Sequence, residues 1–209
     1  MKAAVFDFGG VMTASTMPML AKEFADKAGI PWKAITQGFA KHRHAYDAGD
    51  ITISEMYANI WRDAGLDISE EETALIVKAD RASWLFRNER TLAWMKSLKA
   101  EGRAIGILTN MAPDFAPVFH EHYGDFIAQA DAMVISGLER MHKPNREIYD
   151  LLYSRLNAVR PMGRDNLVFV DDVAENCEAA RAAGWQAIRF ADNGQVERDF
   201  AELCAGEGR

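Results

Sequence analysis

The chain has 209 residues, of which 49% are hydrophobic and 26% charged, and its formal net charge is −7. This composition is typical of a globular protein with one domain and an insertion, or with two small domains. The acidic balance argues against nucleic acid as a partner. No apolar run approaches the roughly 18 residues that a membrane-spanning helix needs, so we expect no membrane partner either.

The amino terminus lacks the layout of a signal peptide, and the two cysteines, Cys177 and Cys204, show no spacing typical of a metal or redox site. We therefore expect reduced cysteines and a cytoplasmic location. Both a monomer and a homodimer are compatible with this composition.

Short apolar runs predict five β-strands, at residues 3–6, 103–108, 132–135, 166–170 and 186–190. Helical patterns separate the later runs, and they cover residues 91–102, 144–156 and 175–184. Pro144 suits the first turn of the second of these helices. Apolar strands that alternate with helices predict a parallel sheet covered on both faces, which is an α/β, Rossmann-like doubly wound fold.

The stretch from residue 13 to residue 86 interrupts this alternation. It contains amphipathic segments, such as ISEMYANIWRDAG and SEEETALIVKADRASWLF, and no convincing strand. Ser54 and Ser69 are the expected N-caps of these two segments, because an acidic residue follows each closely. We therefore predict a helical-bundle cap domain at 13–86, inserted into a core domain formed by 1–12 and 87–209.

Polar residues follow three of the predicted strands at the point where each strand ends. They are Asp7 after the first strand, Thr109 and Asn110 after the second, and Asp171 and Asp172 after the fourth. Parallel strands end at one edge of the sheet, which is where open α/β folds bind ligands. Lys143, directly before a predicted helix, adds a positive charge that we expect at the same edge.

Three carboxylates at one edge would repel one another unless a cation lay among them. Oxygen ligands suit Mg²⁺, so we expect Asp7, Asp171 and Asp172 to bind this ion. A carboxylate can also act as a covalent nucleophile toward phosphorus, and Asp7 is the candidate for that role.

The neighbouring polar groups are candidates for phosphate binding. Lys143 would neutralise the Asp7 carboxylate and a phosphate oxygen. Thr109, Asn110 and the backbone N–H of Gly10 would bind the remaining phosphate oxygens. The site as a whole predicts an anionic, phosphorylated small molecule as substrate.

The order of these motifs resembles the haloacid dehalogenase superfamily, in its branch with a helical cap after the first strand. The matching motifs are FDFGGV, ILTN, the lysine of HKPNREIY, and VFVDDVAENCEAARAAG, which span residues 6 to 184. The resemblance implies Mg²⁺-dependent phosphate ester hydrolysis through an aspartyl-phosphate on Asp7, and a sheet with strand order 5-4-1-2-3. The stretch AYDAGDITISEMYANIW resembles the caps of glucose-1-phosphate phosphatases and of the phosphatase domain of soluble epoxide hydrolases.

One position departs from the pattern that the resemblance implies. Most phosphatases of this superfamily carry a second aspartate two residues after the nucleophile, where this chain has Gly9. A glycine keeps the backbone carbonyl as a metal ligand and loses the general acid, which typically contributes about 10²–10⁴-fold to the rate. Gly9 therefore favours a substrate with an acidic leaving group, such as a sugar 1-phosphate.

The cap offers a second way to supply the missing proton. The segment KHRHAYDAGD contains His42, His44 and Tyr46, and we predict that His42 and Tyr46 contact the substrate. A solvent-exposed helix face explains the same residues equally well.

Two other functions remain open at this stage. A haloacid dehalogenase also lacks the second aspartate, because a halide leaves without a proton. Dehalogenases carry a serine-rich motif where this chain has Asp171 and Asp172. They also carry an arginine soon after the first motif, whereas the first arginine of this chain is Arg43. Both differences argue against this function. A non-catalytic binding module is compatible with Gly9, but not readily with Asp7 and Lys143 together.

Overall fold

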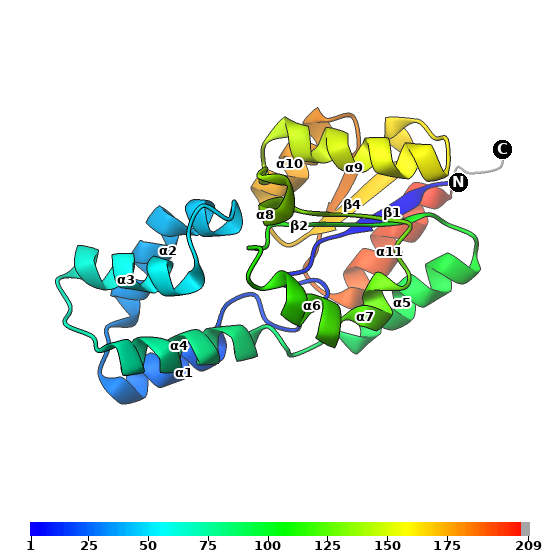
Figure 1. The fold of residues 1–209 in the computed structure, drawn as a ribbon. Helices are drawn as coiled ribbons and strands as arrows, with labels where there is room; N and C mark the ends of the chain where they lie inside the picture. Colours follow the sequence, from blue (N-terminus) through cyan, green and yellow to red (C-terminus); the bar gives the residue numbers. More distant parts are fainter. Residues whose placement is uncertain (206–209) are drawn as a thin grey trace.

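The computed structural model describes residues 1–205, and a five-stranded parallel sheet forms its centre (Figure 1). The strands are β1 (Ala3–Phe6), β2 (Ile105–Thr109), β3 (Ala132–Ile135), β4 (Leu167–Asp171) and β5 (Gln186–Arg189). They lie in the order β3-β2-β1-β4-β5, and every neighbouring pair is parallel. This is the predicted order 5-4-1-2-3 read from the other edge, so the Rossmann-like fold prediction is confirmed.

Helices cover both faces of the sheet (Figure 1). One face packs against α5 (Glu89–Ala100), α6 (Ala116–His122), α7 (Gly124–Ile127) and α11 (Asn193–Cys204). The other face packs against α9 (Arg146–Val159) and α10 (Ala174–Ala182). Successive strand residues point to opposite faces, so Ala4 and Phe6 join the first layer while Ala3 and Val5 join the second. Two short elements, α8 (Ser136–Glu139) and the 3₁₀-helix η1 (Arg164–Asn166), lie in the connections.

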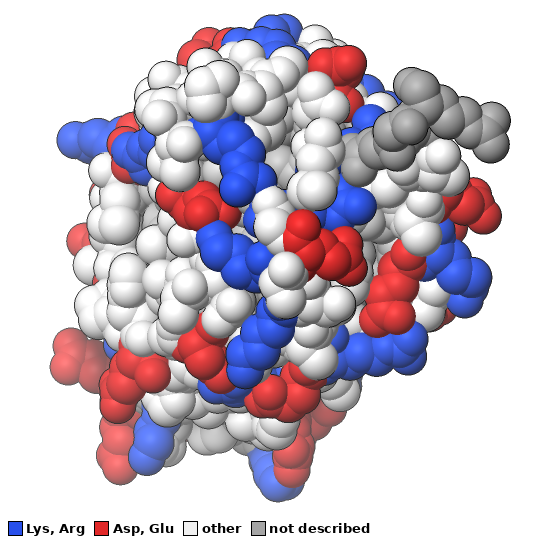
Figure 2. Space-filling view, turned by 90° about the vertical axis from the view of Figure 1, so that its right-hand side faces the viewer, with Lys and Arg blue, Asp and Glu red and all other residues white. Residues whose placement is uncertain are grey.

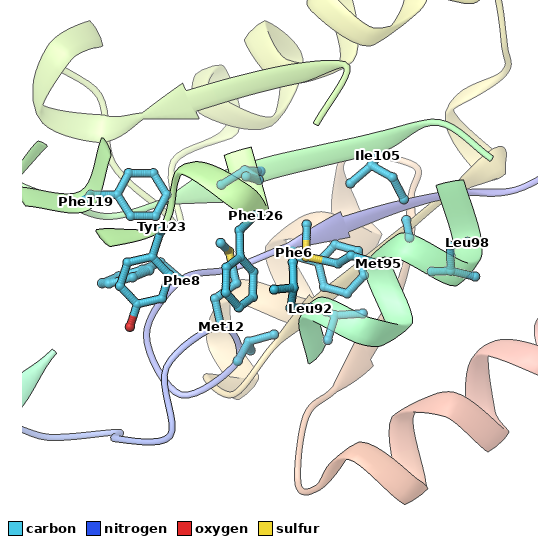
Figure 3. Packing of buried hydrophobic residues seen from close by; sticks show 14 of the residues in the cluster. Phe6, Phe8, Met12, Leu92, Met95, Leu98, Ile105, Phe119, Tyr123 and Phe126 are labelled. Atoms are coloured by element: carbon cyan, nitrogen blue, oxygen red, sulfur yellow. The ribbon is translucent and has the colours of Figure 1, made fainter. Parts of the chain in front are cut away.

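Aromatic packing fixes the segment that follows β1. The Phe8 ring meets Phe119 and Tyr123 edge-on, with centroids 5.0 and 4.9 Å apart (Figure 3). Burying a side chain of this size stabilises the fold by roughly 1.5–3 kcal/mol. The backbone beside Asp7 is therefore anchored by the core rather than left as a free loop.

The segment between β1 and α5 is helical. It contains α1 (Met19–Ala28), α2 (Trp32–Asp47), α3 (Ile53–Ala64) and α4 (Glu70–Ser83). These helices bury an apolar cluster of their own, with α1 packed on α4 and α2 packed on α3. A single antiparallel bridge, Thr13 to Arg87, joins the two points where the chain leaves and re-enters the core. On these grounds we propose that 13–86 is a cap domain on a core of 1–12 and 87–209.

The helix ends differ from the predictions at two places. Thr52, not Ser54, is the N-cap of α3, because its side chain accepts a hydrogen bond from the Glu55 N–H and completes a capping box. Ser69 caps α4 as predicted. Pro144 precedes α9 instead of lying in its first turn, since the helix begins at Arg146. The C-terminal helix is α11, and residues 206–209 lie outside the described residues.

The carboxyl ends of the strands face the cap helices (Figure 1). On the face that points away from the cap, basic and acidic side chains are interspersed (Figure 2). Within residues 1–205, no helix combines the length and the apolar character needed to cross a bilayer.

Candidate active site

A buried lysine joins the ends of two neighbouring strands. β1 pairs with β4, and the Asp7 N–H donates to the Val170 carbonyl at 2.9 Å, so Asp7 lies beside Asp171. Lys143 Nζ is 2.8 Å from Asp7 Oδ1 and 2.6 Å from Asp171 Oδ2. The exposed fractions are 2% for Lys143, 7% for Asp7 and 0% for Asp171. The topology thus brings together three residues that are far apart in the sequence.

Amide side chains position these charged groups. Asn110, after β2, accepts from the Lys143 N–H at 2.8 Å and donates to the Lys143 carbonyl at 3.0 Å. Asn176, in α10, donates to both carboxylate oxygens of Asp171 at 3.1 Å. Asn110 also lines the cavity between the strand ends and the cap that is described below, but its amide is already hydrogen-bonded to the Lys143 backbone. Its geometry is that of a residue that orients Lys143.

The carboxylates carry more negative charge than the lysine neutralises. One oxygen each from Asp7, Asp171 and Asp172 lie within 4.8 Å of one another. Burial, together with the charge of Asp171 and against the attraction of Lys143, raises the pKa of Asp7 to about 8. Burial and the charge of Asp171 likewise raise the pKa of Asp172. Although burial opposes the charge of Lys143, Asp171 and Asp7 raise its pKa above the ordinary value. A divalent cation would offset this repulsion, and the oxygen donors fit Mg²⁺.

The two adjacent glycines serve different purposes. Gly10 has φ of +68°, and a Cβ on it would lie 2.6 Å from Asp172 Oδ2, so only glycine fits there. Its N–H donates to Thr13 Oγ1 and to the Ser15 carbonyl, so the predicted phosphate contact of Gly10 is not supported. Gly9 lines the cavity and has no such φ.

A cavity of about 270 Å³ lies between the strand ends and the cap. Its core side includes Asp7, Asn110, Lys143, Asp172 and Asn176. Its cap side includes Arg43, Tyr46, Asp47, Asp80 and Trp84, and its apolar wall includes Phe8, Met111, Ala112 and Phe115. A molecule of suitable size in this cavity would contact both parts of the chain.

The cap side of the cavity contains its own buried polar network. Arg43 Nε donates to Asp47 Oδ1 at 2.9 Å. Asp80 accepts hydrogen bonds from the Tyr57 hydroxyl at 2.7 Å and from Trp84 Nε1 at 3.0 Å. Burial raises the pKa of Asp80, although the Tyr57 hydrogen bond and the charge of Arg43 oppose the rise.

Asp114, in the loop after β2, ties this network to the core. Its Oδ1 accepts from the Tyr46 hydroxyl at 3.1 Å. Its Oδ2 accepts from Arg81 at 3.0 Å and from the Ile53 N–H at 3.3 Å. These contacts fix three cap helices over the strand ends.

Two other residues that we predicted to contact the substrate, Thr109 and His42, do not line the cavity. Thr109 is only 1% exposed and does not line the cavity, because β2 continues through it and its Oγ1 contacts the Asn110 carbonyl at 3.4 Å. His42 points to α3, where its Nε2 lies 2.7 Å from Asp63 Oδ2. The prediction that His42 contacts substrate is therefore not supported, whereas Tyr46 does line the cavity.

Sequence reasoning did not select Asp80 or Asp114. Neither comes directly after a strand, since Asp114 lies further along the loop after β2 and Asp80 lies in α4. Helical spacing within α4 does not reveal which of its sides meets the cavity. The signal that could have found Asp80 is its acidic character among the apolar positions of an amphipathic helix.

The comparisons with known proteins agree with this architecture. The sequence model of haloacid dehalogenase-like hydrolases matches residues 1–184. The sesquiterpene phosphatase astK of Aspergillus oryzae is 26% identical over 193 residues, which are 92% of this chain and 91% of that protein.

Solved structures share the fold. The enzyme bt-2542 of Bacteroides thetaiotaomicron, in complex with magnesium and inorganic phosphate, superposes with a TM-score of 0.65 at 18% identity, over 94% of this chain and 98% of that one. The L-2-haloacid dehalogenase of Xanthobacter autotrophicus reaches 0.66 at 19% identity, over 97% and 83%. At these identities the likeness establishes the fold alone.

Proposed function

The chain belongs to the haloacid dehalogenase-like hydrolases, and on that premise we propose that it is a Mg²⁺-dependent phosphatase that acts through an aspartyl-phosphate on Asp7. The observation that carries the proposal is the buried Lys143 between Asp7 and Asp171, at the floor of a cavity of substrate size. The similarity to a sesquiterpene phosphatase supports phosphate ester hydrolysis over other chemistry.

The chain's own residues account for the nucleophile. Asp7 Oδ1 accepts from the Phe8 N–H at 2.7 Å and lies 2.8 Å from Lys143 Nζ. Within residues 1–205, Oδ2 has no such partner, so it is the oxygen that we assign to attack on phosphorus. Lys143 orients the carboxylate and stabilises negative charge that develops on the phosphoryl oxygens.

Asp7, Asp171, Asp172 and the carbonyl of Gly9 would bind Mg²⁺, which when bound supplies positive charge to the phosphoryl group. The excess of buried carboxylates over ammonium groups supports this assignment. Asn176 would keep Asp171 oriented as a ligand through its two hydrogen bonds.

Two organic groups are candidates for the substrate. Gly9 favours an acidic leaving group, and a sugar 1-phosphate is the candidate that the sequence resemblance supports. The apolar wall of Phe8, Met111 and Phe115, together with Trp84, favours a phosphate ester with an apolar organic group. A hydroxyl-rich sugar would leave several of its hydrogen bonds unmade against that wall.

A phosphate-release screen with Mg²⁺ tests the proposal. We expect release from glucose 1-phosphate or from a prenyl monophosphate, and loss of release when a chelator is added. Halide release from a 2-haloacid, undiminished by the chelator, would instead support a dehalogenase. Binding of phosphate esters without turnover would support a non-catalytic module.

A further inference from the structure

The glycine at position 9 is not required by the backbone. A Cβ on Gly9 would meet a single atom of the described residues within 4 Å, Trp84 Cζ3 at 3.7 Å, which is ordinary van der Waals contact. The position therefore has room for a side chain, unlike Gly10. If the leaving group needs a proton, another residue of the cavity must supply it.

Most of the cavity's ionisable groups are engaged elsewhere. The Tyr46 hydroxyl donates a hydrogen bond to Asp114 Oδ1 at 3.1 Å. Asp47 is paired with the guanidinium of Arg43, whose Nε donates to Asp47 Oδ1 at 2.9 Å. Asp172 belongs to the carboxylate cluster that suits the cation. Asp80 is the remaining carboxyl group that lines the cavity.

Asp80 lies where a proton donor is needed. It is on the cavity wall near the end of α4 and is only 3% exposed. Trp84, whose Nε1 donates to Asp80 Oδ1, is also the side chain that a Cβ at position 9 would meet. Tyr57 fixes the other oxygen, Oδ2, at 2.7 Å. Each oxygen accepts one hydrogen bond and keeps a lone pair for a proton.

We propose that Asp80 is the general acid of this site and replaces the side chain that Gly9 lacks. The inference rests on the proposed phosphatase function. Burial supports it, because it raises the pKa of Asp80 and so favours the protonated form that a general acid requires.

In this proposal, Asp80 gives up a proton in the first step of the reaction and takes one back in the second. Asp7 Oδ2 attacks phosphorus, and the bond between phosphorus and the organic oxygen breaks. Its electron pair goes to that oxygen, which takes the proton of Asp80 and leaves as an alcohol. A water molecule then attacks phosphorus and gives a proton to the Asp80 carboxylate, and the bond between phosphorus and Asp7 Oδ2 breaks with its electron pair going to Oδ2. Phosphate leaves, and Asp7 and Asp80 return to their starting states.

A series of aryl phosphates with phenols of graded acidity tests the proposal on Asp80→Asn. For the most acidic phenols, we expect kcat/KM within about twofold of wild type, and for the least acidic a loss of about 10²–10⁴-fold. Asp47→Asn is the matched control, because it removes another buried carboxylate from the cap side of the cavity. It should change the rates of all substrates by a common factor. An equal loss across the series for Asp80→Asn would overturn the proposal.

Gly9→Asp gives a second test, and its first part does not depend on the stability of Asp80→Asn. With Asp80 in place, the added carboxyl should give no gain on the least acidic phenols. In the Asp80→Asn background, it should restore at least about tenfold of the lost rate. A gain of that size in the Asp80 background would show that the wild-type site has no acid, and would overturn the proposal. Wild-type enzyme that released no phosphate from any aryl ester would overturn the phosphatase function itself.

Discussion

The core and the cap each bury a cluster of charged residues at the cavity, and the two clusters are built differently. In the core, one ammonium group, on Lys143, lies between two carboxylates, and a third carboxylate lies close by. In the cap, Asp80 accepts hydrogen bonds from the neutral donors Tyr57 and Trp84. The core cluster thus has too few positive charges, whereas both oxygens of the cap carboxylate accept from neutral donors and the charge of Arg43 acts on it only from further away.

This difference indicates that the core and the cap have different chemical roles. A cluster of carboxylate groups that outnumber the neighbouring positive charges favours binding of a divalent cation. A buried carboxyl group with neutral partners retains a proton more easily. We therefore expect the core to supply the nucleophile and the metal ligands, and the cap to supply the proton and part of the substrate contacts. The predictions that follow test this division, beginning with the largest expected effect.

Asp7→Asn should lower kcat by at least about a thousandfold, because an amide does not attack phosphorus. The fold should persist, since the substitution removes a charge whose burial is unfavourable. Steady-state phosphate release and a thermal unfolding curve measure the two effects. Retention of more than a few per cent of the wild-type rate would exclude Asp7 as the nucleophile.

Asp171→Asn should raise the Mg²⁺ concentration for half-maximal rate by about 10–100-fold, as loss of ligand orientation or charge does in other metal sites. Asp172→Asn should raise it less, because Asp171 lies directly between Lys143 and Asn176. Activity titrations with Mg²⁺ after chelation measure both. Equal midpoints for the two variants would contradict the assignment of Asp171 as the principal ligand.

Asp114→Ala should raise KM by about tenfold, because a lost hydrogen bond costs about 1–1.5 kcal/mol and this partly buried carboxylate receives several from the cap. The dependence on leaving-group acidity should stay unchanged. Asp50→Ala is the matched control, since it breaks an exposed ion pair with Arg140 across the same interface. If both variants raised KM alike, Asp114 would have no special role.

Ser69→Ala should lower the free energy of unfolding by about 1 kcal/mol, because it removes the N-cap of α4. Asp80 lies at the other end of that helix, so kcat/KM should not change. Thr52→Ala, which removes the equivalent cap of α3, should behave alike. Denaturant unfolding with activity assays on the same samples tests the pair. A change in kcat/KM would mean that α4 transmits disturbances along its length.

The core side of the site is predictable from the sequence, because the polar residues at strand ends lie at one edge of a parallel sheet. Asp7, Lys143 and Asp171 meet as soon as β1 and β4 are neighbours, and the topology follows from the alternation of elements. Thr109 was misplaced because a strand end predicted to within one or two residues does not fix which way its last side chain points.

The cap side chains that reach the cavity are harder to predict from the sequence. The helices were predicted, but their rotation about their own axes depends on packing that the sequence does not display. His42 thus turns to Asp63, while Asp80 reaches the cavity. Gly9 was recognised as a departure, and the space beside it, bounded by Trp84, could be known only from the structure.

Direct detection of phosphoryl-enzyme tests the central claim. The enzyme would be mixed with excess phosphate ester and Mg²⁺, quenched in acid during turnover, digested, and its peptides examined by mass spectrometry. We predict one phosphoryl group on the peptide that contains Asp7, and none in Asp7→Asn. Steady turnover with no phosphorylated peptide, or with the phosphoryl group on another residue, would contradict the account.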